Sequence, residues 1–170
     1  MRTQVGIIGA GPSGLLLARF LGLAGIAAVV LERRDPEYLR ARIRAGLLEQ
    51  GTVDALVDAG VGERLLRERL VHDGVELAFG GGRLRIDLRG LAGKAVSIYG
   101  QSEIQADLMD CHPADGARYG THVVYEAEAV TLHDTTGPRP RLRYRKAGEP
   151  CEVECDFIGG LPRETRRSRR

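Results

Sequence analysis

Apolar residues in the first 32 positions switch between strand spacing and helix spacing. Val5, Ile7 and Ile8 form a short apolar run typical of a buried parallel strand, and residues 27–31 form a second one. Between the two runs, apolar residues recur at helical spacing: Leu15, Leu16, Leu17, Phe20, Leu21 and Leu23. Gly25 follows at a position where helices commonly end. The pattern predicts a strand, a helix and a second strand.

The next part of the chain has mainly helical patterns. Asp35-Pro36 predicts a turn, and residues 47–59 predict a helix that stops at Gly60. A shorter helix is expected from Glu63 to Arg69. Apolar residues alternate with polar ones on both sides of Gly80-Gly81-Gly82, which predicts a β-hairpin.

Strand patterns dominate the last third of the chain. Residues 96–99 predict a strand, and Ser102 begins a capping-box pattern that places Gln101 just before a helix. We expect Pro113 to end this helix early, with a loop at Asp115-Gly116. Four more strands are expected, at residues 122–126, 129–132, 141–145 and 153–158. The elements together predict an α/β fold, in which a Rossmann-like domain carries an incomplete attached β region.

The turn after the first predicted strand contains the spacing G-x-G-x-x-G. Gly9 allows a tight turn out of the strand, Gly11 lets the backbone approach a pyrophosphate, and Gly14 lets the helix pack closely on the sheet. Backbone N–H groups at the helix start, together with the positive end of the helix dipole, favour phosphate. Because a strand precedes this loop and a helix follows it, the loop predicts a dinucleotide site.

An acidic residue completes this pattern at the end of the second strand. Glu32 lies 18 residues beyond Gly14, where a carboxylate can accept hydrogen bonds from the ribose hydroxyls of an adenosine. NAD, NADP and FAD all bind to this kind of fold, so these residues alone leave the dinucleotide open.

Composition excludes several other classes of protein. The formal net charge is +2, but residues 161–170 hold five Arg and one Glu, which leaves −2 on residues 1–160. Such a body lacks the basic face of a nucleic-acid binder. No apolar run of about 18 residues is present, so we expect no membrane span. The three cysteines, Cys111, Cys151 and Cys155, are an odd number and form no C-x-x-C motif. We therefore expect reduced thiols in a cytoplasmic protein and no metal site.

Several further segments resemble one family closely. They are Glu32-Arg33-Arg34, Arg42-Ile43-Arg44-Ala45-Gly46, Tyr99-Gly100-Gln101 and Asp107-Leu108-Met109. With the glycine loop, they are similar to the N-terminal part of FAD-dependent aromatic hydroxylases of the 4-hydroxybenzoate 3-monooxygenase type. The likeness runs from Met1 to about Gly160, with an irregular patch near residues 111–121. It implies FAD as cofactor, NADPH as co-substrate and a small aromatic acid as substrate.

The resemblance also implies a role for each matching residue. Ser13 and the loop amides (Gly9, Gly11, Gly14) would hold the FAD pyrophosphate, and Glu32 the adenosine ribose. Arg44 and Gln101 would reach the FAD diphosphate and its surroundings, and Arg42 would serve both the flavin and NADPH. Ala45, Gly46 and Leu47 would pass beside the isoalloxazine ring. Arg33, Arg34 and Tyr38 resemble the segment that meets the NADPH 2′-phosphate. No residue of the chain receives a catalytic role.

Other interpretations stay open. Arg42 and Arg44 could form a solvated basic helix face together with Arg40. A short NAD(P)-dependent dehydrogenase is disfavoured, because neither lysine belongs to a Tyr-x-x-x-Lys pair. A non-catalytic flavin-binding or interaction module remains an alternative. A nucleic-acid binder acting through the Arg-rich tail is disfavoured by the acidic body.

The similarity to the family stops just after Gly160. Residues 154–160 approach a Cys-Asp-Gly motif of the family, but the chain continues instead with an Arg-rich stretch that suggests a frameshift, a truncated gene or a natural short form. We therefore expect an FAD-binding domain at residues 1–160 and a disordered tail at 161–170. The second flavin motif and the aromatic-substrate pocket of the family would be missing. A sheet surface left uncovered in this way would favour association, such as a homodimer.

Deleting residues 161–170 is expected to change stability little. Five Arg in the last eight positions, with no apolar residue after Pro162, cannot bury enough surface to offset the cost of ordering. The thermal unfolding midpoint should stay within about a degree or two, since surface changes shift stability by less than ~0.5 kcal/mol. A large drop on deletion would show that the tail packs on the domain.

The chain alone is not expected to hydroxylate 4-hydroxybenzoate, because the resemblance covers no substrate pocket. Positioning a reactant contributes roughly 7–11 kcal/mol to catalysis, so its loss removes the main source of rate. The protein should be incubated with FAD, NADPH, oxygen and 4-hydroxybenzoate, and 3,4-dihydroxybenzoate measured by chromatography. Many turnovers per protein would contradict this expectation.

Overall fold

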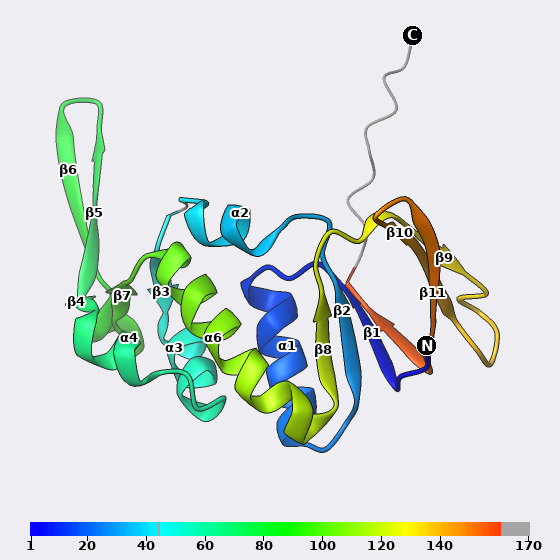
Figure 1. Cartoon of the computed structure of the whole chain (residues 1–170). Coiled ribbons are helices and arrows are strands. Elements are labelled where there is room, and N and C mark those ends of the chain that lie inside the picture. Colours follow the sequence, from blue (N-terminus) through cyan, green and yellow to red (C-terminus); the bar gives the residue numbers. More distant parts are fainter. Residues whose placement is uncertain (44, 161–170) are drawn as a thin grey trace, which may run out of the picture. The chain divides into compact units, whose positions relative to one another are not determined.

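The structure, a computed structural model, describes residues 1–43 and 45–160, with residues 113–119 described by their backbone alone (Figure 1). The chain divides into two compact units, Met1–Leu39 with Leu108–Arg170, and Arg40–Asp107. Arg44 and the tail at 161–170, on which sequence predictions fall, lie outside the described residues.

The first unit is built around a four-stranded parallel sheet in the order β12-β1-β2-β8. Its strands are β1 (Val5–Ile8), β2 (Ala28–Leu31), β8 (Thr121–Val124) and β12 (Phe157–Gly159). Helix α1 (Pro12–Leu23) connects β1 to β2 and ends at Gly25, whose φ of +72° suits a glycine. There the Ile26 N–H donates to the Leu21 carbonyl oxygen at 2.8 Å, as in a Schellman motif. The predicted strand-helix-strand unit is confirmed.

A second, antiparallel sheet packs on one face of the parallel sheet. Its strands are β9 (Glu128–His133), β10 (Arg141–Lys146) and β11 (Glu149–Glu154), in the order β11-β10-β9. The core between the sheets contains Val29, Leu31, Ala127, Leu142, Tyr144 and Val153. A Cβ at Gly6 of β1 would lie 2.7 Å from Leu142 Cδ1, so this strand needs a glycine to admit the leucine. The predicted α/β fold is confirmed.

Helix α6 (Gln101–Tyr119) is longer than the sequence predicts. Pro113 and Asp115-Gly116 lie inside it, so the expected early end and loop are wrong. The helix is anchored before this point by Leu108, Met109 and His112, all buried. The His112 ring nitrogen Nε2 lies 2.9 Å from the Leu15 carbonyl oxygen of α1. Such packing stabilises a helix more than one proline and one glycine weaken it.

The second unit is inserted in sequence between β2 and β8 and has its own small sheets. Three antiparallel strands, in the order β3-β7-β4, are β3 (Leu47–Glu49), β7 (Val96–Ile98) and β4 (Leu70–His72). The hairpin consists of β5 (Gly74–Phe79) and β6 (Gly82–Asp87). Its helices are α3 (Gln50–Asp58), α4 (Glu63–Glu68) and α5 (Leu88–Ala92). Gly80 and Gly81 at the hairpin turn have φ of +53° and +79°, as a type I′ turn requires, and the predicted hairpin is confirmed.

Three local predictions need correction. Residues 47–49 form β3 rather than the first turn of a helix, because they pair with β7. Asp35-Pro36 starts α2 (Pro36–Ala41), where the Asp35 side chain accepts a hydrogen bond from the Tyr38 N–H at 2.7 Å. The predicted strand 153–158 is two strands. The chain changes sheet at Cys155 and Asp156, where the Asp156 N–H donates to Gln4.

No helix of the described residues is long and apolar enough to cross a membrane. None of Cys111, Cys151 and Cys155 forms a disulfide within the described residues, and Cys155 is buried. Within residues 1–43 and 45–160, no group of three or more His, Cys, Asp or Glu side chains is arranged to hold a metal ion.

Candidate functional site

The glycine loop lies at the carboxyl end of β1, where the chain order of the parallel sheet reverses. Crevices at such points are the usual ligand sites of open α/β sheets. Gly9 has a φ of +99°, and its N–H donates to the Leu31 carbonyl oxygen of β2 at 2.8 Å. A Cβ at Gly14 would lie 2.0 Å from the Gly9 carbonyl oxygen, so the start of α1 packs directly on the loop.

Gly11 has the opposite surroundings. A Cβ added at Gly11 would meet no atom within 4 Å, so this glycine borders open space. Gly11 is the N-cap of α1, with Pro12 at the first helical position and no side chain capping the helix start. The first turn carries no acidic residue, and Ser13 is exposed there. Unblocked N–H groups beside a hydroxyl suit an anion such as phosphate.

Glu32 is held rigidly beside this loop. Its side chain is buried, and Oε2 accepts a hydrogen bond from the Ala10 N–H at 2.9 Å. The other oxygen, Oε1, accepts from the Arg34 N–H at 2.9 Å. Because a carboxylate has about four acceptor positions, each oxygen retains capacity for a further donor. The structure thus brings together the glycine loop and the acid that the sequence predicts as its partner.

The segment after Glu32 is exposed and basic. Arg33, Arg34 and Tyr38 all lie at the surface, on the loop before α2 and on the helix itself. The Arg34 guanidinium lies over the Tyr38 ring, 4.7 Å from its centroid. This cation–π contact orders two long side chains while leaving the hydrogen-bond donors of the arginine available.

The remaining predicted site residues belong to the second unit. Gly46 packs against the end of β7: the Tyr99 N–H donates to the Gly46 carbonyl oxygen at 2.7 Å, and a Cβ at Gly46 would lie 2.2 Å from the Tyr99 carbonyl oxygen. Gln101 is the first residue of α6, whereas the capping-box pattern predicted it just before the helix. Arg42 and Leu47 are exposed. Within this unit the structure therefore places Gly46 beside Tyr99, two residues before Gln101.

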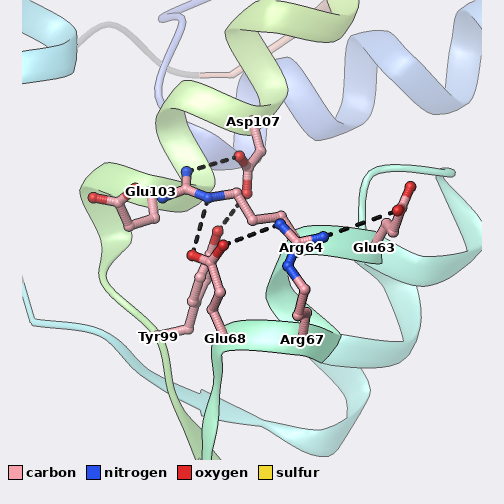
Figure 2. A network of polar contacts seen from close by, with 7 residues as sticks. All are labelled: Glu63, Arg64, Arg67, Glu68, Tyr99, Glu103 and Asp107. Carbon is pink, nitrogen blue, oxygen red and sulfur yellow. Dashed lines mark hydrogen bonds and ion pairs between the residues drawn. The ribbon is translucent and has the colours of Figure 1, made fainter.

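Sequence analysis missed a network of ionic side chains in the second unit, around the segment that joins β7 to α6 (Figure 2). Arg64 of α4 contacts Glu68 of its own helix and both Glu103 and Asp107 of α6. Tyr99 donates its hydroxyl proton to Asp107 Oδ2 at 2.7 Å. Among the contacts of Arg64 in the described part of the chain, only the one with Glu68, four residues along the same helix, has a local signal that could have been found in the sequence.

Comparison with known proteins identifies the family. The FAD binding domain family matches residues 2–160. The chain belongs to this family. It is 42% identical over 161 residues to the p-hydroxybenzoate hydroxylase of Acinetobacter baylyi, a match that covers 94% of this chain and 39% of that protein. The chain therefore spans about two fifths of the length of this relative.

Solved structures agree in fold with this FAD-binding domain. The anhydrotetracycline hydroxylase OxyS from Streptomyces rimosus has a TM-score of 0.71 at 28% identity, over 93% of this chain and 31% of that one. The p-nitrophenol 4-monooxygenase PnpA from Pseudomonas putida has a TM-score of 0.75 at 18% identity, over 92% of this chain and 40% of that one. The latter likeness concerns the fold alone.

The two loop glycines of the FAD-binding domain should respond differently to the same substitution. Gly14→Ala should lower the free energy of unfolding by roughly 1–3 kcal/mol, because its methyl group collides with the Gly9 carbonyl oxygen. Gly11→Ala should lower it by about 1 kcal/mol or less, because its methyl group enters open space and only the preference for glycine over alanine at the N-cap is lost. Urea denaturation of both variants measures the difference. Equal effects would contradict the packing described here.

Proposed function

We propose that this chain forms the FAD-binding portion of an NADPH-dependent flavoprotein monooxygenase acting on a small aromatic acid such as 4-hydroxybenzoate. The observation that carries the proposal is the buried Glu32 carboxylate, hydrogen-bonded to the glycine loop at Ala10 in a chain of the FAD binding domain family. The 42% identity to a p-hydroxybenzoate hydroxylase supports the reaction class and the substrate class.

The first unit would hold the adenosine half of FAD. The open space at Gly11 gives room for a pyrophosphate beside the start of α1, and the Ser13 hydroxyl and the N–H groups of Gly11, Ser13 and Gly14 would donate to it. The Glu32 carboxylate, already fixed by two backbone N–H groups, would accept from the ribose hydroxyls with its remaining lone pairs. The open space and the donors and acceptors of these residues suit a diphosphate and a ribose.

The second unit would supply the flavin-side contacts. Arg42 and Arg44 carry guanidinium groups that suit phosphate oxygens, and Gln101 carries an amide that both donates and accepts. Gly46 and Leu47 would lie along the isoalloxazine ring. The close contact between Gly46 and Tyr99 supports this role, because it fixes the backbone at the place where a planar ring needs a defined surface.

NADPH would meet the exposed segment that follows Glu32. Arg33 and Arg34 provide positive charge for a 2′-phosphate, and Tyr38 holds the Arg34 guanidinium over its ring. Bound FAD would supply the redox chemistry, taking electrons from NADPH and passing them to oxygen. The part of these residues is to bind and orient the two nucleotides.

A non-catalytic flavin-binding module is the second candidate, because the contacts of Glu32 and of the glycine loop concern nucleotide binding alone. The two candidates differ in one measurable property. A monooxygenase portion oxidises NADPH when FAD is bound, whereas a non-catalytic module binds FAD without consuming NADPH.

FAD should bind more tightly than NAD, and Glu32 should contribute to this affinity. Calorimetric titration of the full chain with each dinucleotide measures the preference. Glu32→Gln keeps the side-chain volume and one acceptor oxygen but removes the charge, so FAD affinity should fall by roughly 1.5–3 kcal/mol, the typical value of a hydrogen bond to a charged group. Folding of the variant is checked by thermal unfolding.

Glu128→Ala is the matched control, because it removes an exposed carboxylate from β9 of the same unit. Its FAD affinity should equal that of the unchanged protein. Tighter binding of NAD than of FAD, or equal losses in the Glu32 and Glu128 variants, would contradict the assignment.

A further inference from the structure

We propose that Arg64 is a positioning residue for the flavin-side contacts of the second unit, an inference that rests on the proposed function. Within the described part of the second unit, Arg64 has no hydrogen bond or ion pair with Gly46 itself. Its role would be to hold the corner between β7 and α6, where Tyr99, Gly100 and Gln101 follow one another.

The Arg64 guanidinium connects α4 to the first two turns of α6 (Figure 2). Nε donates to Glu68 Oε2 at 3.0 Å, Nη1 donates to Asp107 Oδ1 at 3.2 Å, and Nη2 donates to Glu103. The planar fork of an arginine can satisfy three carboxylates in fixed directions, which a lysine cannot. These contacts raise the pKa of Arg64, with Glu103 as the main cause and Asp107 as the next.

Asp107 extends this network to the end of β7. While its Oδ1 accepts from Arg64, its Oδ2 accepts from the Tyr99 hydroxyl at 2.7 Å. The Tyr99 side chain is buried, and burial followed by the hydrogen bond to Asp107 raises its pKa well above the ordinary value. The phenol therefore stays protonated and keeps donating across the physiological pH range. Arg64 thus fixes Asp107, and Asp107 fixes the Tyr99 ring.

The Tyr99 backbone contacts Gly46, one of the residues proposed to lie along the flavin. Its N–H and carbonyl oxygen both face Gly46, at a distance that excludes any side chain there. On the other side of the corner, the Gly100 carbonyl oxygen accepts from the Glu103 N–H at 3.0 Å and so begins α6. Gln101 lies between Tyr99 and Glu103, both of which the network holds. Loss of the Arg64 contacts would therefore make the positions of both Gly46 and Gln101 less well defined.

Because this network is partly exposed, its effect on local geometry can be distinguished from its effect on global stability. The Arg64, Glu68 and Glu103 side chains are each about two fifths exposed, while the Asp107 side chain is largely buried. Ion pairs with this exposure contribute little to global stability, because water and salt screen them. Loss of Arg64 should consequently affect the local geometry of the corner more than the unfolding of the chain.

Arg64→Gln is the decisive variant, and the readouts are FAD affinity, the absorption spectrum of bound FAD and amide hydrogen exchange at Tyr99. We expect the dissociation constant for FAD to rise on the order of tenfold. Loss of residues that orient the ligands of a metal without touching the metal has an effect of this size. The Tyr99 amide, which donates to Gly46, should exchange faster in the cofactor-free variant. Arg64→Lys should restore part of the affinity, since it keeps the charge without the fork.

Arg67→Gln is the matched control, because Arg67 lies on the same helix and pairs with Glu63 and Glu68 but contacts no residue of α6 in the part of the chain described. It should leave FAD affinity within about twofold, as expected for a surface substitution. Tyr99→Phe removes only the hydroxyl that reaches Asp107 and provides a milder second variant if Arg64→Gln fails to fold.

The outcomes distinguish this inference from the proposed function. FAD binding by the unchanged protein with equal affinity in Arg64→Gln would overturn the positioning role alone. Faster Tyr99 exchange with unchanged FAD affinity and spectrum would identify a purely structural network and would also overturn it. If neither the unchanged protein nor the Glu32→Gln variant binds FAD, the proposed function itself is contradicted.

Discussion

The close approach of α1 to the end of β1 is the constraint on which the first unit depends. A side chain at Gly14 would lie 2.0 Å from the Gly9 carbonyl oxygen, so only a glycine lets the helix begin directly over the loop. That position turns the Ala10 N–H toward Glu32 and leaves open space beside Gly11. If the helix were displaced, Glu32, the glycine loop and the open space beside Gly11 would no longer lie next to one another.

The second unit achieves the same kind of contact by different means. Gly46 meets the Tyr99 carbonyl oxygen as closely as Gly14 meets that of Gly9, with a Cβ distance of 2.2 Å. The Tyr99 side is held instead by its hydroxyl bond to Asp107 and by the ionic contacts of Arg64. One unit thus orders its contact through backbone packing, and the other through a charged network.

Features encoded by neighbouring residues could be predicted from the sequence. The strand-helix-strand unit, the glycine loop and the hairpin at Gly80-Gly81 each follow from local periodicity or from the backbone freedom of glycine. The errors arose where distant contacts decide. Residues 47–49 become a strand because β7 pairs with them, and α6 continues through Pro113 although local rules predict its end. The Arg64 network was missed because Glu103 and Asp107 lie 39 and 43 residues from Arg64.

Glu32 shows why a predicted residue type does not by itself explain a site. Its position after the second strand is visible in the sequence, but its two bonds to the Ala10 and Arg34 N–H groups are not. These bonds compensate the burial of a charged group, which would otherwise be costly, and they fix both oxygens before any ligand arrives. A flexible surface glutamate would lose side-chain entropy on binding a ribose. Glu32 has already lost it on folding, so the same two hydrogen bonds to a ribose would contribute more of their energy to affinity.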